Sequence, residues 1–178
     1  MIGSRGLNYL RRKERSIDWR LPLEAPFAPT PEEAISVALK LAGLREGELL
    51  YDLGCGDGRV LIKAAKEFGA TAVGFEVQRK LVEEAKKRIR KAGVKGRAKT
   101  LKKDFFKEDL SAADVVYIYS YPPTMEALAE KLCRELKHGS RVVTYRYPIQ
   151  NWIPHRVGAC SGHSIFLYRL PESTHQTD

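Results

Sequence analysis

Three glycines that directly follow a short apolar run constrain this chain more than any other feature. Residues 49–53 are apolar except for one aspartate, and such a run predicts a buried strand. Gly54, Gly56 and Gly58 follow at once. Because glycine has no Cβ, a loop this poor in side chains lets backbone N–H groups approach a ligand at the C-terminal edge of a parallel sheet. The sequence therefore predicts a ligand site at that edge.

The residues after the glycines complete a β-α-β unit. Residues 60–68 place apolar side chains on one face of a predicted helix that stops at Gly69, and residues 72–76 form a second apolar strand. That strand ends in Glu76, 24 positions after Asp52. An acidic residue at this distance is placed to bind the two hydroxyls of a ribose. The unit therefore predicts a nucleoside site.

The carboxylates around the glycine loop argue against a dinucleotide. The dinucleotide motif is G-x-G-x-x-G, whereas here the third glycine comes one residue early. Asp52 and Asp57 would repel a pyrophosphate, so a nicotinamide-dependent oxidoreductase is disfavoured. They suit a ligand with an ammonium group, such as the methionine end of S-adenosylmethionine (SAM). The alternative, a tight turn capped by Asp57, does not explain Asp52 and Glu76 together.

The loop resembles the first motif of the class I, seven-strand, SAM-dependent methyltransferases. The motif reads Asp52-Leu-Gly-Cys-Gly-Asp-Gly58, and Phe27-Ala-Pro-Thr-Pro31 precedes it. Over residues 26–169 the chain is most similar to the archaeal protein lysine methyltransferases and their mitochondrial relatives. The resemblance implies an α/β fold, with a Rossmann-like, mostly parallel sheet, an antiparallel C-terminal edge hairpin and helices on both faces. It also implies SAM as cofactor and lysine side chains of proteins as acceptors.

The glycine loop and the resemblance together give a set of expected cofactor-binding residues. In the family, the segment at residues 27–30 lies across the SAM pocket, and an acid and a flat apolar side chain after the third strand contact adenine. The expected residues are Phe27, Thr30, Asp52, Gly54, Cys55, Gly56, Asp57, Gly58, Glu76, Asp104 and Phe105. For the last two, the alternative is an exposed aspartate at a turn beside a core phenylalanine.

Tyr119, Ser120 and Tyr121 are the expected catalytic residues. They end the predicted fourth strand, and the resemblance places them at the acceptor channel, where they would position the amine without a dedicated base. Adenine-N6 methyltransferases carry Asn or Asp, Pro-Pro and then an aromatic residue, whereas here Tyr121 precedes the two prolines and Thr124 follows them. This difference counts against a nucleic-acid adenine acceptor. The alternative is a proline-fixed turn before a helix.

Local patterns predict two helix starts and a terminal hairpin. Thr30 is expected to cap the first helix as part of a capping box, with Pro31 at the first helical position. Thr124 is expected to cap a later helix. Residues 152–157 and 163–168 flank a stretch with two glycines and are predicted to pair as an antiparallel hairpin at the sheet edge.

Charge and composition divide the chain into three parts. Residues 1–25 are predicted to be a basic extension, residues 26–170 the methyltransferase domain and residues 171–178 a polar tail. The extension either covers an edge of the domain or helps to hold substrate or nucleic acid. The net charge is +9, from 31 basic and 22 acidic residues. Such an excess attracts polyanions or acidic protein surfaces, or it only solvates helix faces.

The remaining expectations concern compartment and competing functions. The chain has no apolar run as long as a membrane span and no signal-peptide pattern, so we expect a cytoplasmic protein. We also expect a monomer. Cys55, Cys133 and Cys160 lack metal-like spacing, so they are read as reduced thiols and no metal site is predicted. The alternatives are an RNA or small-molecule methyltransferase and, in another class, a non-catalytic SAM-binding or nucleic-acid-binding protein.

Overall fold

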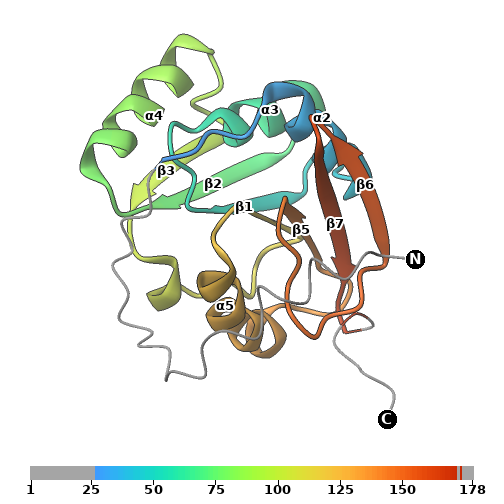
Figure 1. Ribbon diagram of the computed structural model, residues 1–178. Coiled ribbons are helices and arrows are strands. Elements are labelled where there is room, and N and C mark those ends of the chain that lie inside the picture. The colour runs from blue at the N-terminus through green and yellow to red at the C-terminus, as the bar shows by residue number, and fades with distance from the viewer. Residues whose placement is uncertain (1–26, 172, 174–178) are drawn as a thin grey trace.

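A seven-stranded sheet is the centre of the fold (Figure 1). The computed structural model describes residues 27–171 and 173. The strands in chain order are β1 (Leu49–Leu53), β2 (Thr71–Glu76), β3 (Ala98–Lys102), β4 (Val115–Ile118), β5 (Arg141–Tyr145), β6 (Arg156–Cys160) and β7 (His163–Arg169). In space their order is β3-β2-β1-β4-β5-β7-β6.

Strands β1 to β5 run parallel, and β7 and β6 are antiparallel additions at one edge. Parallel neighbours need a crossover between them, and helices supply those crossovers here. The C-terminal ends of the parallel strands therefore all lie at one edge of the sheet. The prediction of a mostly parallel, Rossmann-like sheet with an antiparallel C-terminal hairpin is confirmed.

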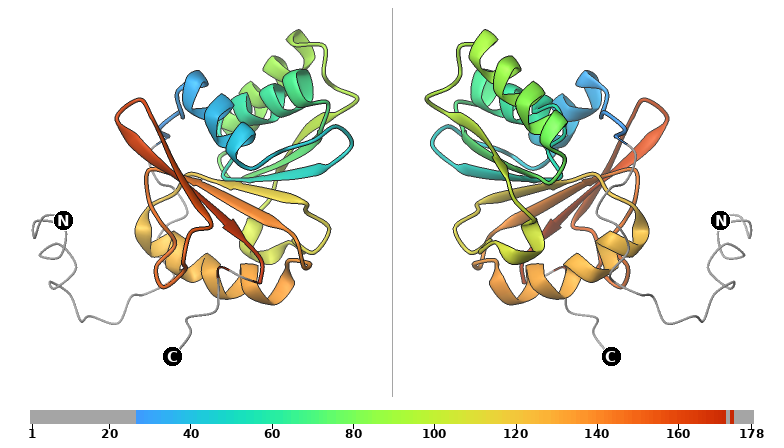
Figure 2. Two further views of the ribbon diagram at one scale, coloured as in Figure 1. Left: turned by 90° about the vertical axis from the view of Figure 1, so that its right-hand side faces the viewer. Right: turned by 90° about the vertical axis from the view of Figure 1, so that its left-hand side faces the viewer.

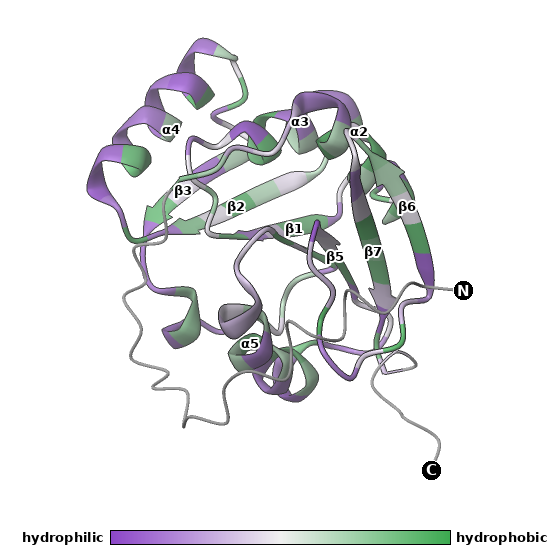
Figure 3. Cartoon of the chain, viewed as in Figure 1, coloured by the Kyte–Doolittle hydropathy of each residue, from purple (hydrophilic) through white to green (hydrophobic). Residues whose placement is uncertain are grey.

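Helices cover both faces of the sheet, as predicted (Figure 2). Helices α2 (Glu32–Leu41), α3 (Arg59–Phe68) and α4 (Arg79–Lys91) share one face, and their apolar sides contribute to one core cluster. Helix α5 (Pro122–Glu135) and the short 3-10 helix η1 (Phe105–Lys107) contribute to the cluster on the other face. The visible outer turns of α4 are mostly purple, polar residues (Figure 3). In the part of the chain that is described, no helix is long and apolar enough to cross a bilayer.

The hairpin forms, but the predicted position of its first strand, residues 152–157, was wrong. Strand β6 begins four residues later than predicted and includes Gly158, which pairs with Ile165. Gly158 thus lies within the strand and not in the turn, and a Cβ there would make only an ordinary contact, at 3.5 Å, with Leu41 in α2. Ser161 and Gly162 form the two-residue turn, with φ of 53° and 76°, as a type I′ hairpin requires.

Both predicted threonine caps are wrong. Helix α2 starts at Glu32 with Pro31 in the N-cap position and no side-chain cap, while the Thr30 hydroxyl bonds elsewhere. Helix α5 starts at Pro122 with Tyr121 as N-cap, so Thr124 lies inside the helix. In both places proline's fixed φ sets the helix start without a side-chain cap. The predicted extension at residues 1–25 and most of the predicted tail lie outside the described residues.

Candidate active site

A cleft opens where the C-terminal ends of β1, β2 and β4 meet. Residues 27–30, here called the strap, form one wall of it. Ten of the fourteen predicted site residues line the cleft: Phe27, Thr30, Asp52, Gly54, Cys55, Asp57, Glu76, Phe105, Tyr119 and Ser120. Gly56, Gly58, Asp104 and Tyr121 are not among its lining residues. The two ends of one cleft thus contain most of the residues predicted for the cofactor and for the acceptor.

Glu76 is held rigidly at the end of β2. One oxygen, Oε2, accepts a hydrogen bond from the N–H of Gly56 at 3.0 Å. The other, Oε1, accepts from the N–H groups of Val77 and Gln78 at 2.8 and 2.9 Å. These three bonds fix the carboxylate against the glycine loop at the cleft wall, and Oε2, which accepts only one of them, retains acceptor capacity for a ligand.

Asp52 is the most unusual polar group in the cleft. Its residue is 2% exposed, and its Oδ2 atom has no hydrogen-bond partner among the described residues. Burial raises the pKa of this carboxyl well above its usual range, and the charges of Glu76 and Asp57 raise it further. A buried carboxyl without a partner is costly for the fold, and such groups are characteristic of functional sites.

Asp57 forms ion pairs with two arginines, whereas the sequence predicted that it binds the cofactor. Arg59 binds its carboxylate through Nε and Nη2, the latter at 2.7 Å, and Arg88 of α4 binds the same carboxylate. Burial alone would raise the pKa of Asp57, but the hydrogen bonds and charges of these arginines hold it below its usual range. The carboxylate is therefore already neutralised, and Asp52 is the better partner for a ligand ammonium.

The strap is anchored across the cleft by two contacts. The Thr30 hydroxyl and the Tyr117 phenol, on β4, are 2.9 Å apart and buried. Near its start, the Phe27 ring lies against Gly56, so closely that a Cβ on Gly56 would fall into the ring. Gly56 also has a φ of +51°, which favours glycine. The strap can therefore pack this closely on the loop only because residue 56 has no side chain.

Gly58 and Cys55 have packing roles in the loop. Gly58 is the N-cap of α3 with a φ of +78°, and a Cβ there would approach the Ala85 side chain of α4 to 3.0 Å. Cys55 lines the cleft with its thiol 3.3 Å from the Thr100 hydroxyl. Burial, and after it the Asp52 charge, raises the pKa of the Cys55 thiol well above its usual value, so the thiol is neutral and not a nucleophile.

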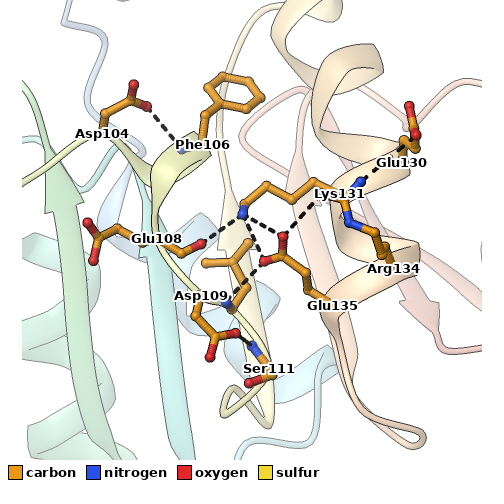
Figure 4. A network of polar contacts seen from close by, with 10 residues as sticks. Asp104, Phe106, Glu108, Asp109, Ser111, Glu130, Lys131, Arg134 and Glu135 are labelled. Carbon is orange, nitrogen blue, oxygen red and sulfur yellow. Dashed lines mark hydrogen bonds and ion pairs between the residues drawn. The ribbon is translucent and has the colours of Figure 1, made fainter.

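Phe105 reaches the cleft from η1, whereas Asp104 supports this turn from behind. Asp104 Oδ1 accepts a hydrogen bond from the N–H of Phe106 at 3.0 Å, which caps η1. Figure 4 shows how the segment after η1 is fixed to α5. There the buried Lys131 donates to the carbonyl of Glu108 and to the Glu135 carboxylate, at 2.7 Å each. These bonds hold the Phe105 ring in place without help from a ligand.

The end of the cleft at β4, where the acceptor is predicted to bind, is aromatic. Tyr119 lines it, and its ring meets Tyr145 edge-on with centroids 5.1 Å apart. Tyr121 is 44% exposed and lies at the rim, where its ring is 6.5 Å from that of Tyr147. Ser120 lines the cleft between the two tyrosines. The sequence thus placed two of its three expected catalytic residues in the cleft and the third beside it.

Sequence reasoning missed Arg146, an exposed residue whose side chain lies beside this end. The N–H of Tyr147 bonds the carbonyl of Tyr145 at 2.9 Å, so Arg146 is the central residue of a γ-turn with a φ of +73°. Its guanidinium lies 5.2 Å from the Tyr147 ring centre, and its interaction with Tyr119 raises the pKa of the guanidinium. A non-glycine residue in this conformation is strained, and such strain is concentrated at functional sites. No local pattern in the sequence signals it.

The arrangement fits SAM on three structural grounds. Asp52 offers an unpartnered buried carboxyl, Glu76 presents a fixed carboxylate, and Gly54 lines the cleft with open space where a side chain would lie. An ammonium group beside Asp52 would supply the charge that its environment lacks. Among residues 27–171 and 173, no group of three His, Cys, Asp or Glu side chains could hold a metal ion.

Comparison with known proteins decides the family. The model of the ANTKMT methyltransferase domain family matches residues 52–156. The chain belongs to this family. It is a SAM-dependent methyltransferase, as its glycine loop and sheet predicted.

Individual relatives agree with that assignment. A protein-lysine N-methyltransferase of Saccharolobus islandicus is 40% identical over 83% of this chain and 94% of the relative. An adenine nucleotide translocase lysine N-methyltransferase of Mus musculus is 31% identical over 75% of this chain, but the match spans only 58% of that relative. Among solved structures, an RNA methyltransferase from Salinibacter ruber in complex with S-adenosyl-L-homocysteine is 36% identical, with a TM-score of 0.79 over 82% of this chain and 95% of that one.

Proposed function

We propose that this methyltransferase transfers the methyl group of SAM to the side-chain amine of lysine in proteins. The similarity to the archaeal protein-lysine N-methyltransferase supports this acceptor, because it extends over 94% of that relative. The observation that carries the proposal is the chemistry of the acceptor end. Tyr119 and Ser120 line it with an aromatic ring and a hydroxyl, and none of the described residues that line this end is a carboxylate.

In this proposal each cofactor-binding residue contacts a different part of the SAM molecule. The unpartnered Asp52 carboxyl binds the ammonium group, and the Glu76 carboxylate binds the ribose hydroxyls. The Phe105 ring packs against adenine, and the strap covers the bound cofactor through Phe27 and Thr30. SAM supplies the activated methyl group, and the protein provides position and a dry environment.

The acceptor residues favour the neutral amine. A free lysine has a pKa of about 10.4, so at neutral pH almost every side chain is protonated and cannot attack. A site lined by the Tyr119 ring, which packs on the buried Tyr145, disfavours the ammonium form by desolvation. The positive guanidinium of Arg146 beside Tyr119 adds like-charge repulsion. The Tyr119 and Ser120 hydroxyls then orient the amine, and water removes its proton.

An RNA acceptor is the second candidate. Its support is the 36% identity to the Salinibacter ruber RNA methyltransferase and the net charge of +9. The lysine acceptor is favoured because the segment before α5 lacks the acidic or amide residue ahead of Pro-Pro that adenine-N6 methyltransferases carry. The two acceptors are distinguished by one labelling experiment.

That experiment incubates the enzyme with methyl-labelled SAM and a whole-cell extract, and then treats portions with protease or nuclease. The proposal expects label that is lost to protease and is recovered as methyl-lysine after hydrolysis. Label lost to nuclease would contradict it and assign the acceptor to RNA. Tyr119→Phe should lower turnover, whereas Tyr51→Phe, which changes a tyrosine outside the cleft lining, should not.

A further inference from the structure

The positive charge of this protein is concentrated in one segment. Residues 79–103 contain twelve of the 31 basic residues and two of the 22 acidic ones. The rest of the chain has nineteen basic and twenty acidic residues, so it is close to neutral. The segment comprises α4, the turn after it and β3, which is the edge strand of the sheet.

Helix α4 packs on the edge strand β3, so the segment lies together at one edge of the sheet. Helix α4 packs on β3 and β2 through Val82, Ala85 and Ile89, so its other sides face outward (Figure 1). Arg79, Lys86 and Arg90 follow one another at helical spacing along the flank opposite Arg88, which points to the glycine loop. The exposed outer side of α4 is purple in Figure 3.

Most of these cations have no ion-pair partner within the described part of the chain. Lys86, Arg88, Arg97 and Lys103 are paired with acidic residues. Eight others are exposed and outside every described ion pair: Arg79, Lys80, Lys87, Arg90, Lys91, Lys95, Lys99 and Lys102. An exposed surface with this excess of one charge attracts a ligand of the opposite charge.

The stability of α4 and of the sheet edge accounts for only some of these cations. Arg90 and Lys91 in the last turn of α4 are favoured by the helix dipole, and lysines such as Lys99 protect an edge strand from pairing. Arg79 and Lys80 are different, because they occupy the first turn of α4, which contains no acidic residue. Cations there oppose the helix dipole and weaken the helix.

The composition of the surface favours a nucleic-acid duplex over an acidic protein. Protein interfaces need apolar or aromatic anchors, yet residues 79–103 contain no Trp, Tyr or Phe. The exposed large apolar side chains of the described residues, such as Ile153 and Val157, all lie elsewhere. Single strands are also bound by stacking on aromatic rings. Phosphates of a duplex need only lysine and arginine.

We propose that the surface formed by α4, residues 92–97 and β3 binds the phosphate backbone of a nucleic-acid duplex. It is a docking surface and not the acceptor site. Gln78 and Leu81, at the start of α4, line one end of the cleft, whereas Tyr119 and Ser120 line its far end at β4, on the other side of β1. Binding is therefore independent of sequence and of SAM, and it is independent of which acceptor the cleft takes.

The test measures binding of the full chain to a random-sequence DNA duplex of about 20 base pairs by fluorescence anisotropy, as a function of salt. The variant replaces Lys87, Arg90, Lys91 and Lys95 by glutamine, and these positions lie outside the cleft lining. The matched control replaces four other exposed cations by glutamine, Lys40, Arg45, Arg156 and Arg169. Thermal unfolding of both variants confirms that the fold is retained.

The test variant should bind roughly tenfold or more weakly than the wild type, with a salt slope smaller by up to about 3–4. The control variant should lose much less, and both should methylate as the wild type does in the absence of nucleic acid. Equal losses in the two variants, or no binding of the wild type at about 50 mM salt, would overturn the proposal. Tighter binding of polyglutamate than of duplex would also overturn it, in favour of an acidic protein.

Discussion

The hydroxyl of Thr30 and the phenol of Tyr117 lie 2.9 Å apart in the interior, although 87 positions separate them in the chain. The bond joins the strap to β4, directly beside the strand end that leads into Tyr119. It therefore couples the strap, the proposed cover of the cofactor, to the strand that positions the proposed acceptor residues. Burial strengthens such a bond and makes its loss costly.

Thr30→Val should lower the free energy of unfolding by about 1–3 kcal/mol, because it leaves a buried phenol without its partner. Thr30→Ser retains a hydroxyl and should cost much less. In a double-mutant cycle with Tyr117→Phe, measured by denaturant unfolding, the double variant should be more stable than the sum of the single losses predicts. Strict additivity would show that the two groups do not interact.

Asp52→Asn should weaken SAM binding roughly 10- to 150-fold, since a hydrogen bond to a charged group contributes about 1.5–3 kcal/mol. Calorimetric titration with SAM measures this loss. An unchanged affinity would remove Asp52 from the ammonium site.

The same variant makes a prediction about pH and stability. The folded pKa of Asp52 is raised above the unfolded value of about 3.9, so its stabilising contribution is complete below that pH and is lost as pH rises through the folded pKa. Asp52→Asn lacks this dependence. Without SAM, the Tm of the variant relative to the wild type should therefore increase as pH rises above about 4. A difference that is constant with pH would contradict the raised pKa.

Glu76→Gln should raise the Kd for SAM at least about tenfold, because one carboxylate oxygen is replaced by an NH2 group that cannot accept hydrogen bonds. It would also leave at least one of the N–H groups of Gly56, Val77 and Gln78 without a partner. Glu84→Gln, at an exposed position of α4, is the matched control and should bind SAM as the wild type does. Similar affinities for the two variants would contradict the ribose assignment.

Arg146→Gly should increase the stability of the protein and decrease its activity. Glycine relieves the strain of a positive φ, so the free energy of unfolding should rise by about 1 kcal/mol, while the loss of the contacts to Tyr119 and Tyr147 should lower kcat. Ser161→Gly, which relieves the same kind of strain in the β6–β7 turn, should stabilise without changing kcat. Steady-state kinetics and thermal unfolding check both variants, and equal kcat values would exclude a role for Arg146.

Local sequence patterns account for the parts of the protein that are contiguous in the chain. The strand β1, the glycine loop, α3 and β2 follow from local periodicity, and Glu76 ends β2 as predicted. Asp52 was also identified from its place before the first glycine. These predictions succeed because a β-α-β unit encodes its ligand edge within about 30 residues.

Features that depend on distant partners came only from the packed fold. Arg88, 31 positions away, helps to neutralise Asp57, and Tyr117 takes the hydroxyl that the sequence assigned to a helix cap. The first arm of the hairpin, β6, packs on α2 and begins four residues later than predicted, and a strained turn places Arg146 beside Tyr119 and Tyr147. Local patterns report periodicity and propensity, whereas such contacts are fixed only when the packed sheet brings separate segments together.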